Sequence, residues 1–285
     1  METFDFSTLY TKIPHDKLTD VLCKLVDFCF DGGSHNFLFT NDWGARWVSD
    51  PNSYDFVYDK AKIKLAVRYL MSNCFFSFGN RVFRQIIGIP MGSDPAPFFA
   101  NLFLYYYESK WVKEVQRQDI ARARKFSLVF RFIDDLLTFN DDGEFARSFR
   151  EIYPPELELN KENEGTAKAS FLDLDNEIVN RKISTSLFDK RDSFPFSIVR
   201  MPFLCSNIPS NMFYFSFGAE ILRIARVSSS TENFVTAARA LVNRITRQGG
   251  VINRMKRVLG KIYASHTESF DHIFNEVTTL FDILI

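Results

Sequence analysis

The sequence predicts an α+β fold, in which strands and helices interleave up to about residue 190 and a mostly helical part follows. Three observations support this prediction. Thr3–Ser7 alternates apolar and polar residues, as a short strand does. After Pro14, apolar side chains recur at the spacing of one helix face, and from Ser216 onward the same helical spacing dominates.

The elements of the first part follow from these patterns in order. Pro14 opens a helix, because proline is tolerated in a first helical turn. Residues 31–58 are expected to form an irregular insertion, since they are rich in aromatic residues and turn formers. A second amphipathic helix covers Lys60–Ser72. A hairpin then spans residues 74–87, because Gly79-Asn80 is a turn signal between two aromatic-rich runs.

A long helix is expected over Asp94–Val115, with Ser93 as its N-cap. A second hairpin follows within Phe126–Phe139, and its tip is predicted to be Asp134-Asp135. The remaining elements of this part are a helix, a strand and a further hairpin, expected at Glu144–Ile152, near Glu156–Leu159, and over Phe171–Val179 with Ile183–Asp189.

Charge is balanced overall but unevenly distributed. The 285 residues carry 35 basic and 35 acidic side chains, yet residues 1–178 have a net charge of −6 and residues 179–285 of +6. Asn233–Thr267 contains no acid at all. This asymmetry is typical of a part that handles metals beside a part that holds a polyanion. The alternative is an ordinary solvated basic helix face.

Other classes of protein are excluded by composition. Four cysteines at irregular spacing argue against a disulfide scaffold and a zinc site, and are typical of thiols in an intracellular protein. No signal peptide precedes the first helix, and no apolar run reaches the roughly 18 residues that a membrane helix needs. We therefore expect no membrane partner.

Acidic residues interrupt two apolar strands. Asp134 and Asp135 lie in the centre of one apolar stretch, and Asp5 lies between Phe4 and Phe6 in another. Burying unpaired carboxylates is costly, so convergence of these acids would require divalent cations. Mg²⁺ prefers carboxylate oxygens, and two such ions can stabilise the attacking and leaving oxygens at phosphorus. The alternatives are an Asp-rich turn and a surface-facing strand residue.

The run Gly88–Pro97 is dense in glycine, proline and small residues just before the long helix. Small residues let a backbone approach a ligand closely, and a helix start nearby favours anions. The alternative is a strand-to-helix loop with a capping serine.

Four segments resemble reverse transcriptase motifs A, B, C and E in that order, namely Asp5–Pro14, Gly88–Asn101, Phe132–Asp135 and Phe171–Leu174. Their variants, and the later stretches Asp189–Asp192 and Ile224–Arg226, are similar to Penelope-like retroelement reverse transcriptases, which are relatives of the telomerase catalytic subunit. The resemblance implies an RNA-directed DNA polymerase. It further implies a palm over residues 1–190, an antiparallel sheet with helices on one face, and a connection with a helical thumb over residues 191–285.

The resemblance also assigns site residues. Two Mg²⁺ ions, with Mn²⁺ as an alternative, would be held by Asp5, Asp134, the adjacent Asp135 and the backbone carbonyl of Phe6. Tyr10 would lie under the sugar and exclude a 2′-hydroxyl, and Gly92 and Ser93 would lie near the incoming nucleotide and template. Lys161 is a candidate proton donor to pyrophosphate. The primer grip would be Phe171, Leu172, Asp173 and Leu174, and the contacts to the nucleic-acid backbone would be Arg239, Arg244, Arg247, Arg254, Lys256, Arg257 and Lys261.

Several of these residues have a purely structural alternative role. Tyr10 could be a core aromatic, Lys161 a surface lysine and Phe171–Leu174 an ordinary edge hairpin. The partners that the resemblance implies are an RNA template, a DNA primer and a dNTP, in an intracellular, nuclear protein. An RNA-dependent RNA polymerase palm is disfavoured by Tyr10 and by Phe-Ile-Asp-Asp in place of a Gly-Asp-Asp tip.

The sequence departs from the family in two places. Met91 stands where many reverse transcriptases have glutamine, although Gln85 is close by. The chain begins four residues before Asp5, so the upstream fingers have no counterpart, and no GIY-YIG endonuclease-like segment follows the thumb. We therefore expect a palm and thumb fragment. The alternative function is a catalytically inactive retroelement fragment that only binds nucleic acid.

Overall fold

The computed structural model describes residues 1–32, 36–139, 142–163, 167–196 and 198–273. The chain divides into two compact units. The first unit is Phe4–Glu162, and the second is Asn163–Ile285 together with Met1–Thr3. The predicted boundary at residue 190 falls inside the second unit, so the hairpin around Phe171–Leu174 groups with the helices that follow it. The end of the predicted thumb, residues 274–285, lies outside the described residues.

A four-stranded sheet is the centre of the first unit, with strand order β7-β8-β1-β9. Its strands are β1 (Glu2–Phe6), β7 (Val129–Phe132), β8 (Asp135–Thr138) and β9 (Leu159–Lys161). β7 pairs antiparallel with β8, and β1 pairs antiparallel with β9. The strand of Asp5 is therefore the immediate neighbour of the strand that follows Asp134.

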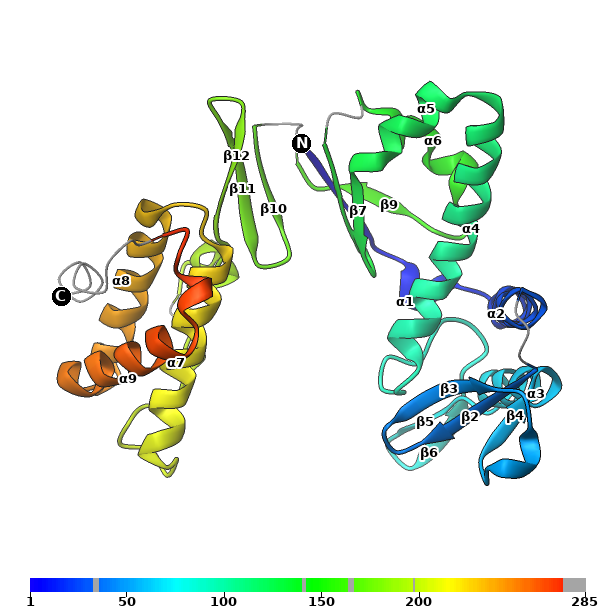
Figure 1. The fold of residues 1–285 in the computed structure, drawn as a ribbon, viewed down its shortest axis with the longest axis horizontal. Coiled ribbons are helices and arrows are strands. Elements are labelled where there is room, and N and C mark those ends of the chain that lie inside the picture. Colours follow the sequence, from blue (N-terminus) through cyan, green and yellow to red (C-terminus); the bar gives the residue numbers. More distant parts are fainter. Residues whose placement is uncertain (33–35, 140–141, 164–166, 197, 274–285) are drawn as a thin grey trace. The chain divides into compact units, whose positions relative to one another are not determined.

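Helices cover one face of this sheet (Figure 1). Phe4 and Phe6 are each only 3% exposed and lie against helix α6 (Glu144–Ile152), with ring centroids 5.3 Å apart for Phe4 and Phe145. Because side chains alternate along a strand, Asp5 lies on the opposite face from these two rings. The alternation of apolar and acidic residues in β1 thus separates the core face of the sheet from an open face.

Six helices belong to the first unit in the described ranges: α1 (Leu9–Lys12), α2 (His15–Asp31), α3 (Lys60–Ser72), α4 (Ala96–Gln118), α5 (Ile120–Lys125) and α6. The predictions for α3 and α6 are confirmed at both ends. The prediction of Ser93 as N-cap of the long helix is wrong, because Pro95 occupies that position. The Ser93 hydroxyl instead donates to the Pro90 carbonyl at 2.9 Å, within the preceding turn.

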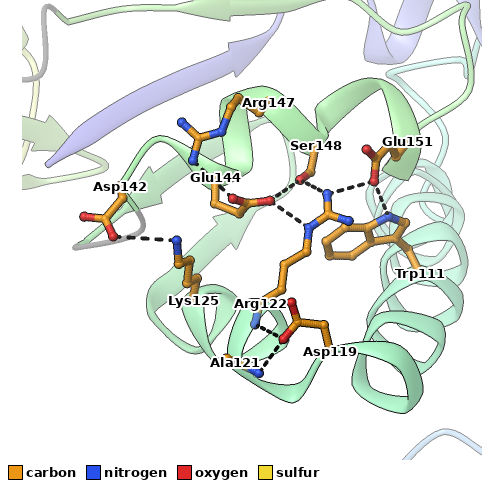
Figure 2. A network of polar contacts seen from close by, with 10 residues as sticks. All are labelled: Trp111, Asp119, Ala121, Arg122, Lys125, Asp142, Glu144, Arg147, Ser148 and Glu151. Atoms are coloured by element: carbon orange, nitrogen blue, oxygen red, sulfur yellow. Dashed lines mark hydrogen bonds and ion pairs between the residues drawn. The ribbon is translucent and has the colours of Figure 1, made fainter.

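A polar network joins α4, α5 and α6 (Figure 2). The Arg122 guanidinium of α5 donates to Glu144 at 2.7 Å and to Glu151 at 2.9 Å, both on α6. The Trp111 indole of α4 donates to the same Glu151 carboxylate at 3.3 Å, and Arg122 lies over the Trp111 ring. Local sequence patterns could not predict this network, because its members come from three separate helices.

The prediction of an irregular insertion over residues 31–58 is wrong, although residues 33–35 lie outside the described ranges. The segment forms a three-stranded antiparallel sheet with order β3-β2-β4, made of β2 (Phe37–Asn41), β3 (Gly44–Val48) and β4 (Val57–Asp59). Aromatic side chains stabilise it, because Arg46 lies over the rings of both Phe39 and Tyr54. A short 3₁₀ helix, Pro51–Ser53, precedes β4.

The hairpin predicted around Gly79-Asn80 is confirmed, although it is shorter than residues 74–87. It consists of β5 (Phe75–Phe78) and β6 (Arg81–Arg84). Gly79 has φ +58°, a conformation that favours glycine, and the rings of Phe76 and Phe83 stack across the strands at 5.6 Å. A 3₁₀ turn, Phe126–Leu128, leads from α5 into β7.

The second unit contains a three-stranded antiparallel sheet and three long helices in its described residues. The strands are β10 (Lys168–Phe171), β11 (Leu174–Val179) and β12 (Lys182–Leu187), and the helices are α7 (Ser210–Val227), α8 (Thr231–Arg247) and α9 (Ile252–Ser265). Short 3₁₀ helices lie at Lys190–Ser193 and Thr267–Ser269. The predicted helical character of this part is confirmed. The Asn233 amide of α8 donates to the Thr185 carbonyl of β12 at 2.8 Å, which joins sheet and helices.

The α+β class is confirmed by these antiparallel sheets and helices. Within the ranges that the structure describes, no helix combines the length and apolar character needed to cross a membrane.

Candidate active site

The sheet brings two acidic segments together that are far apart in the sequence. The backbone N–H of Phe6 donates to the carbonyl of Asp134 at 3.1 Å. Asp5 precedes Phe6 directly on β1, so the backbone of Asp5 lies one residue from the point where β1 contacts the turn that carries Asp134. The pairing on which convergence of the acids depended, with the strand of Asp5 beside the Asp134 hairpin, is therefore present, and convergence of the carboxylates themselves stays a prediction.

The tip of the β7–β8 hairpin differs from the prediction by one residue. Phe132 pairs with Asp135, so the turn residues are Ile133 and Asp134, and Asp135 begins β8. Ile133 has φ +56°, a left-handed conformation that few β-branched residues adopt. Propensity alone would not place isoleucine there, which explains the error.

Asp135 belongs to the open face of the sheet. Leu136, the next residue, is buried in the core at 1% exposure, so alternation places Asp135 on the other face. Its cross-strand neighbour Phe132 is 54% exposed. Asp5 lies on the same open face, because its neighbours Phe4 and Phe6 are buried.

The segment that begins at Gly88 docks on helix α1. The Gly88 N–H donates to the Ile13 carbonyl and the Ile89 N–H donates to the Tyr10 carbonyl, each at 2.8 Å. Gly88 has φ +83°, and a Cβ atom there would lie 2.5 Å from the Tyr10 carbonyl oxygen. Only glycine fits this close approach. The docking fixes the glycine-rich loop beside the helix that carries Tyr10.

Tyr10 itself lies near the acidic turn. Its side chain is half-buried against the core of the first unit. Partial burial, together with the negative charge of Asp134, raises the pKa of the Tyr10 phenol. The structure therefore brings Tyr10 and Asp134 within electrostatic range of each other. The same packing is compatible with the core role left open for Tyr10, so its role at a sugar stays a prediction.

Gly92 and Ser93 line a cavity of about 520 Å³. No heavy atom lies within 4 Å of where a Cβ atom on Gly92 would be, so its backbone is open to approach. Met91 is 71% exposed and lines the same cavity as Gln85. Met91, which stands where many family members have glutamine, and the nearby Gln85 therefore line one cavity.

Lys161 is not brought to the face of Asp5. The register pairs Phe4 with Lys161 and Asp5 with Asn160. Directly paired residues share a face, so Asn160 lies beside Asp5 and Lys161 lies on the side of Phe4. Asn160 was not predicted as a neighbour of Asp5, because its only signal in the sequence is its place before Lys161. The proton-donor role of Lys161 stays a prediction.

The segment predicted as the primer grip is the β10–β11 turn of the second unit. Phe171 pairs with Leu174, and the turn residues are Leu172, at φ +56°, and Asp173. Asp173 forms an ion pair with Arg223 of α7 at 3.5 Å. The turn is thus a tight hairpin fixed to a helix, and its role in holding a primer stays a prediction.

Arg244 and Arg254, which are among the seven predicted backbone-binding cations, have identified partners inside the second unit. Arg244 contacts the Asp189 carboxylate at 3.3 Å, and Arg254 lies 4.4 Å from the centre of the Tyr214 ring. Burial raises the pKa of Asp189, but hydrogen bonds and charge from Arg191, with Arg244, outweigh it and lower that pKa to about 2. Arg247, Lys256, Arg257 and Lys261 are exposed and form no ion pair with the described residues.

The donor atoms at the acidic turn fit magnesium by their chemistry. No group of three or more His, Cys, Asp or Glu side chains able to hold a metal occurs in the part of the chain that the structure describes. Mg²⁺, however, is usually bound through one or two carboxylates and completes its shell with water and substrate phosphates. The carboxylates of Asp5 and Asp134, with the Phe6 carbonyl, are hard oxygen donors of this kind.

No protein-family model matches the chain, and no curated protein matches it. Among solved structures, the chain is similar to telomerase from Candida albicans in complex with a TWJ fragment of telomeric RNA, at TM-score 0.54 and 12% identity over 99% of this chain. It also matches apo telomerase from Candida tropicalis, at TM-score 0.47 and 13% identity over 99% of this chain. The chain spans 43% and 51% of those two chains. At this identity the likeness is one of fold: the chain has a mixed α/β fold similar to part of telomerase.

Proposed function

We propose that the chain is the palm and thumb of a Penelope-like RNA-directed DNA polymerase. The first unit is the palm and the helices of the second unit are the thumb. One observation carries the proposal: the hydrogen bond from the Phe6 N–H of β1 to the Asp134 carbonyl of the β7–β8 turn holds the backbone of the two motif acids close together. The telomerase-like fold supports the same conclusion.

The reaction would be attack of a primer 3′-hydroxyl on the α-phosphate of a dNTP, with pyrophosphate as the leaving group. Asp5 and Asp134 would hold two Mg²⁺ ions, with Asp135 beside them on the open face. When bound, these ions supply stabilisation of the attacking and leaving oxygens at phosphorus. The chain's own contribution is to fix both carboxylates on a rigid sheet, through backbone hydrogen bonds.

The nucleotide would lie against the loop that docks on α1. Tyr10 would oppose the sugar, where a ring clashes with a 2′-hydroxyl. Gly92 presents an open backbone in the cavity of about 520 Å³, and Met91 with Gln85 would meet the template there. The loop's two hydrogen bonds to α1 support this arrangement, because they fix Tyr10 and the loop to each other.

The second unit would hold the RNA template and the DNA primer. Exposed cations such as Arg257 and Lys261, four residues apart on α9, would contact phosphates. Contacts of this kind give sequence-independent binding that weakens as salt rises. A nuclear, intracellular location follows from the retroelement assignment.

Metal binding and primer extension together test the proposal. Mn²⁺, detected by electron paramagnetic resonance, replaces Mg²⁺ as the probe, and extension is measured with a DNA primer on an RNA template, dNTPs and Mg²⁺. Asp5→Asn and Asp134→Asn should each abolish both signals. Asp42→Asn is the matched control, because Asp42 is an exposed acid in the β2–β3 turn.

Two outcomes would count against the proposal. If Asp5→Asn or Asp134→Asn still extends the primer, the assignment of the metal site is wrong. Salt-dependent binding of primer–template without any extension would instead favour the alternative, a fragment that binds nucleic acid and does not catalyse.

A further inference from the structure

The side chain of Arg131 lies largely buried and hydrogen-bonds to the acidic turn. Arg131 of β7 is only 10% exposed in its side chain. Its Nε donates to Glu108 Oε1 at 2.5 Å, and its Nη2 donates to Glu108 Oε2 at 2.9 Å. The guanidinium therefore forms a bidentate pair with the Glu108 carboxylate on α4. Bidentate pairs of this kind are strong and fix the geometry of both partners.

The same guanidinium contacts α4 a second time and reaches the turn. Its Nη1 donates to the Asn101 side-chain oxygen at 2.5 Å and to the Ile133 carbonyl at 3.2 Å. The Tyr153 hydroxyl donates to Glu108 Oε1 at 2.6 Å. Burial and the Glu108 charge raise the pKa of Tyr153, so this hydroxyl keeps its proton.

These bonds act on the peptide groups that flank Asp134. The Ile133 carbonyl belongs to the planar peptide that leads into Asp134, and it accepts from Arg131. The Asp134 carbonyl belongs to the next peptide, and it accepts from the Phe6 N–H. With both peptide planes held, the direction of the Asp134 Cα–Cβ bond is fixed.

The turn needs such support. The left-handed region is unfavourable for any residue with a Cβ atom, and Ile133 at φ +56° is β-branched as well. A strained residue persists only where its surroundings hold it in place. Arg131 supplies that hold from the core side of the sheet, since its strand partner Leu136 is buried.

We propose that Arg131 is a positioning residue for Asp134. It fixes the acidic turn from behind and joins it to α4, the helix that follows the loop of Gly92 and Ser93. Its effect at a metal rests on the proposed function, whereas its hold on the turn does not. Loss of the bidentate Arg131–Glu108 pair should make the β7–β8 turn more mobile while the rest of the first unit stays folded.

The test uses Arg131→Lys, which keeps the charge but cannot reproduce the fork. Arg122→Lys is the matched control, because Arg122 also joins two acids of the first unit but has no contact with the turn among its described bonds. Hydrogen exchange of a peptide spanning residues 130–137 reports the turn. Mn²⁺ binding reports the acidic site without requiring catalysis.

We expect exchange in the turn to quicken by at least about tenfold in Arg131→Lys and to stay unchanged in Arg122→Lys. The dissociation constant of Mn²⁺ should rise by about 10- to 100-fold, the usual effect of removing support behind metal ligands. If Arg131→Lys does not fold, Glu108→Gln is the second variant. It weakens the fork from the other side and should quicken exchange in the same peptide.

The outcomes separate this inference from the proposed function. Turn exchange in Arg131→Lys that matches Arg122→Lys would overturn the positioning role. Wild-type protein that binds no Mn²⁺ through Asp134 would overturn the proposed metal site and leave the exchange result to decide on Arg131 alone. Quickened exchange with unchanged Mn²⁺ affinity would overturn the link between the turn and the metal.

Discussion

Gly88→Ala should destabilise the first unit strongly, although it adds a single methyl group. Gly88 has φ +83°, and its added Cβ would lie 2.5 Å from the Tyr10 carbonyl oxygen and 3.1 Å from the Thr11 carbonyl oxygen. Both neighbours are backbone atoms of α1, so no side-chain rotation relieves the clash. The loop would have to move away from the helix.

The cost follows from three contributions. The left-handed conformation costs roughly 1–2 kcal/mol for a residue with a Cβ atom. Displacement of the loop breaks the hydrogen bonds from Gly88 to Ile13 and from Ile89 to Tyr10, each worth about 1 kcal/mol. We therefore expect Gly88→Ala to lower the free energy of unfolding by about 3–4 kcal/mol.

Urea unfolding followed by tryptophan fluorescence measures this loss. All three tryptophans, Trp43, Trp47 and Trp111, belong to the first unit, so the signal reports that unit alone. Gly92→Ala is the matched control, because nothing lies within 4 Å of its added Cβ. At usual urea m-values of about 1–3 kcal/mol/M, the midpoint of Gly88→Ala should fall by at least about 1 M. Equal midpoints for the two variants would refute the docked-loop reasoning.

Four further predictions concern other contacts. The hydrogen bond from Arg122 outweighs partial burial and, with Arg147 and Ser148, lowers the pKa of Glu144 from 4.5 to about 2. This carboxylate therefore stabilises the fold above about pH 4.5 and loses its effect as the pH falls towards 2. Allowing for solvent screening, Glu144→Gln should cost about 1–2 kcal/mol at pH 6 and little at pH 2, by urea unfolding at both values. Arg181→Gly should raise the melting temperature of the second unit, because Arg181 has φ +62° in the β11–β12 turn, whereas Arg181→Ala should not. Tyr10→Ala should admit ribonucleotides in primer extension, and unchanged sugar selectivity would count against its role. Arg257→Gln with Lys261→Gln should lower nucleic-acid affinity and reduce the slope of log affinity against log salt by about one to two, as titration at several salt concentrations would show.

Local sequence patterns predicted those helices and hairpins in which the intrinsic preference of the residues matches the structure they adopt. The helices over Lys60–Ser72 and Glu144–Ile152 were predicted to the residue, because their apolar spacing fits a single buried face. The hairpin around Gly79 followed from a turn residue that tolerates positive φ. The sheet over residues 37–59 escaped prediction, because its stability comes from ring contacts across strands and not from a clean alternation.

The candidate site was predictable in its residue types and not in its geometry. Acids inside apolar strands marked Asp5 and Asp134 as candidates that would converge if their strands were neighbours, and the strand order β7-β8-β1 makes them neighbours. The turn at Ile133 was missed because the residue opposes its own propensity. Support for it comes from Arg131, which Glu108 of α4 binds, and Tyr153 after the end of α6 donates to that Glu108. These residues are far apart in the chain, so no spacing in the sequence could reveal the network.

The structure separates the cations of the second unit into those that have partners within the unit and those that are exposed and form no ion pair with the described residues. The acid-free run contains seven cations, and counting them suggests one continuous surface for phosphates. Arg244 and Arg254, however, are engaged by Asp189, Tyr214 and Asn211 within the unit. A guanidinium held in this way would have to leave its partners before it could contact a phosphate. Phosphate binding should therefore depend more on Arg257 and Lys261 of α9 than on Arg244, and Arg244→Gln should reduce stability more than it reduces the salt dependence of binding.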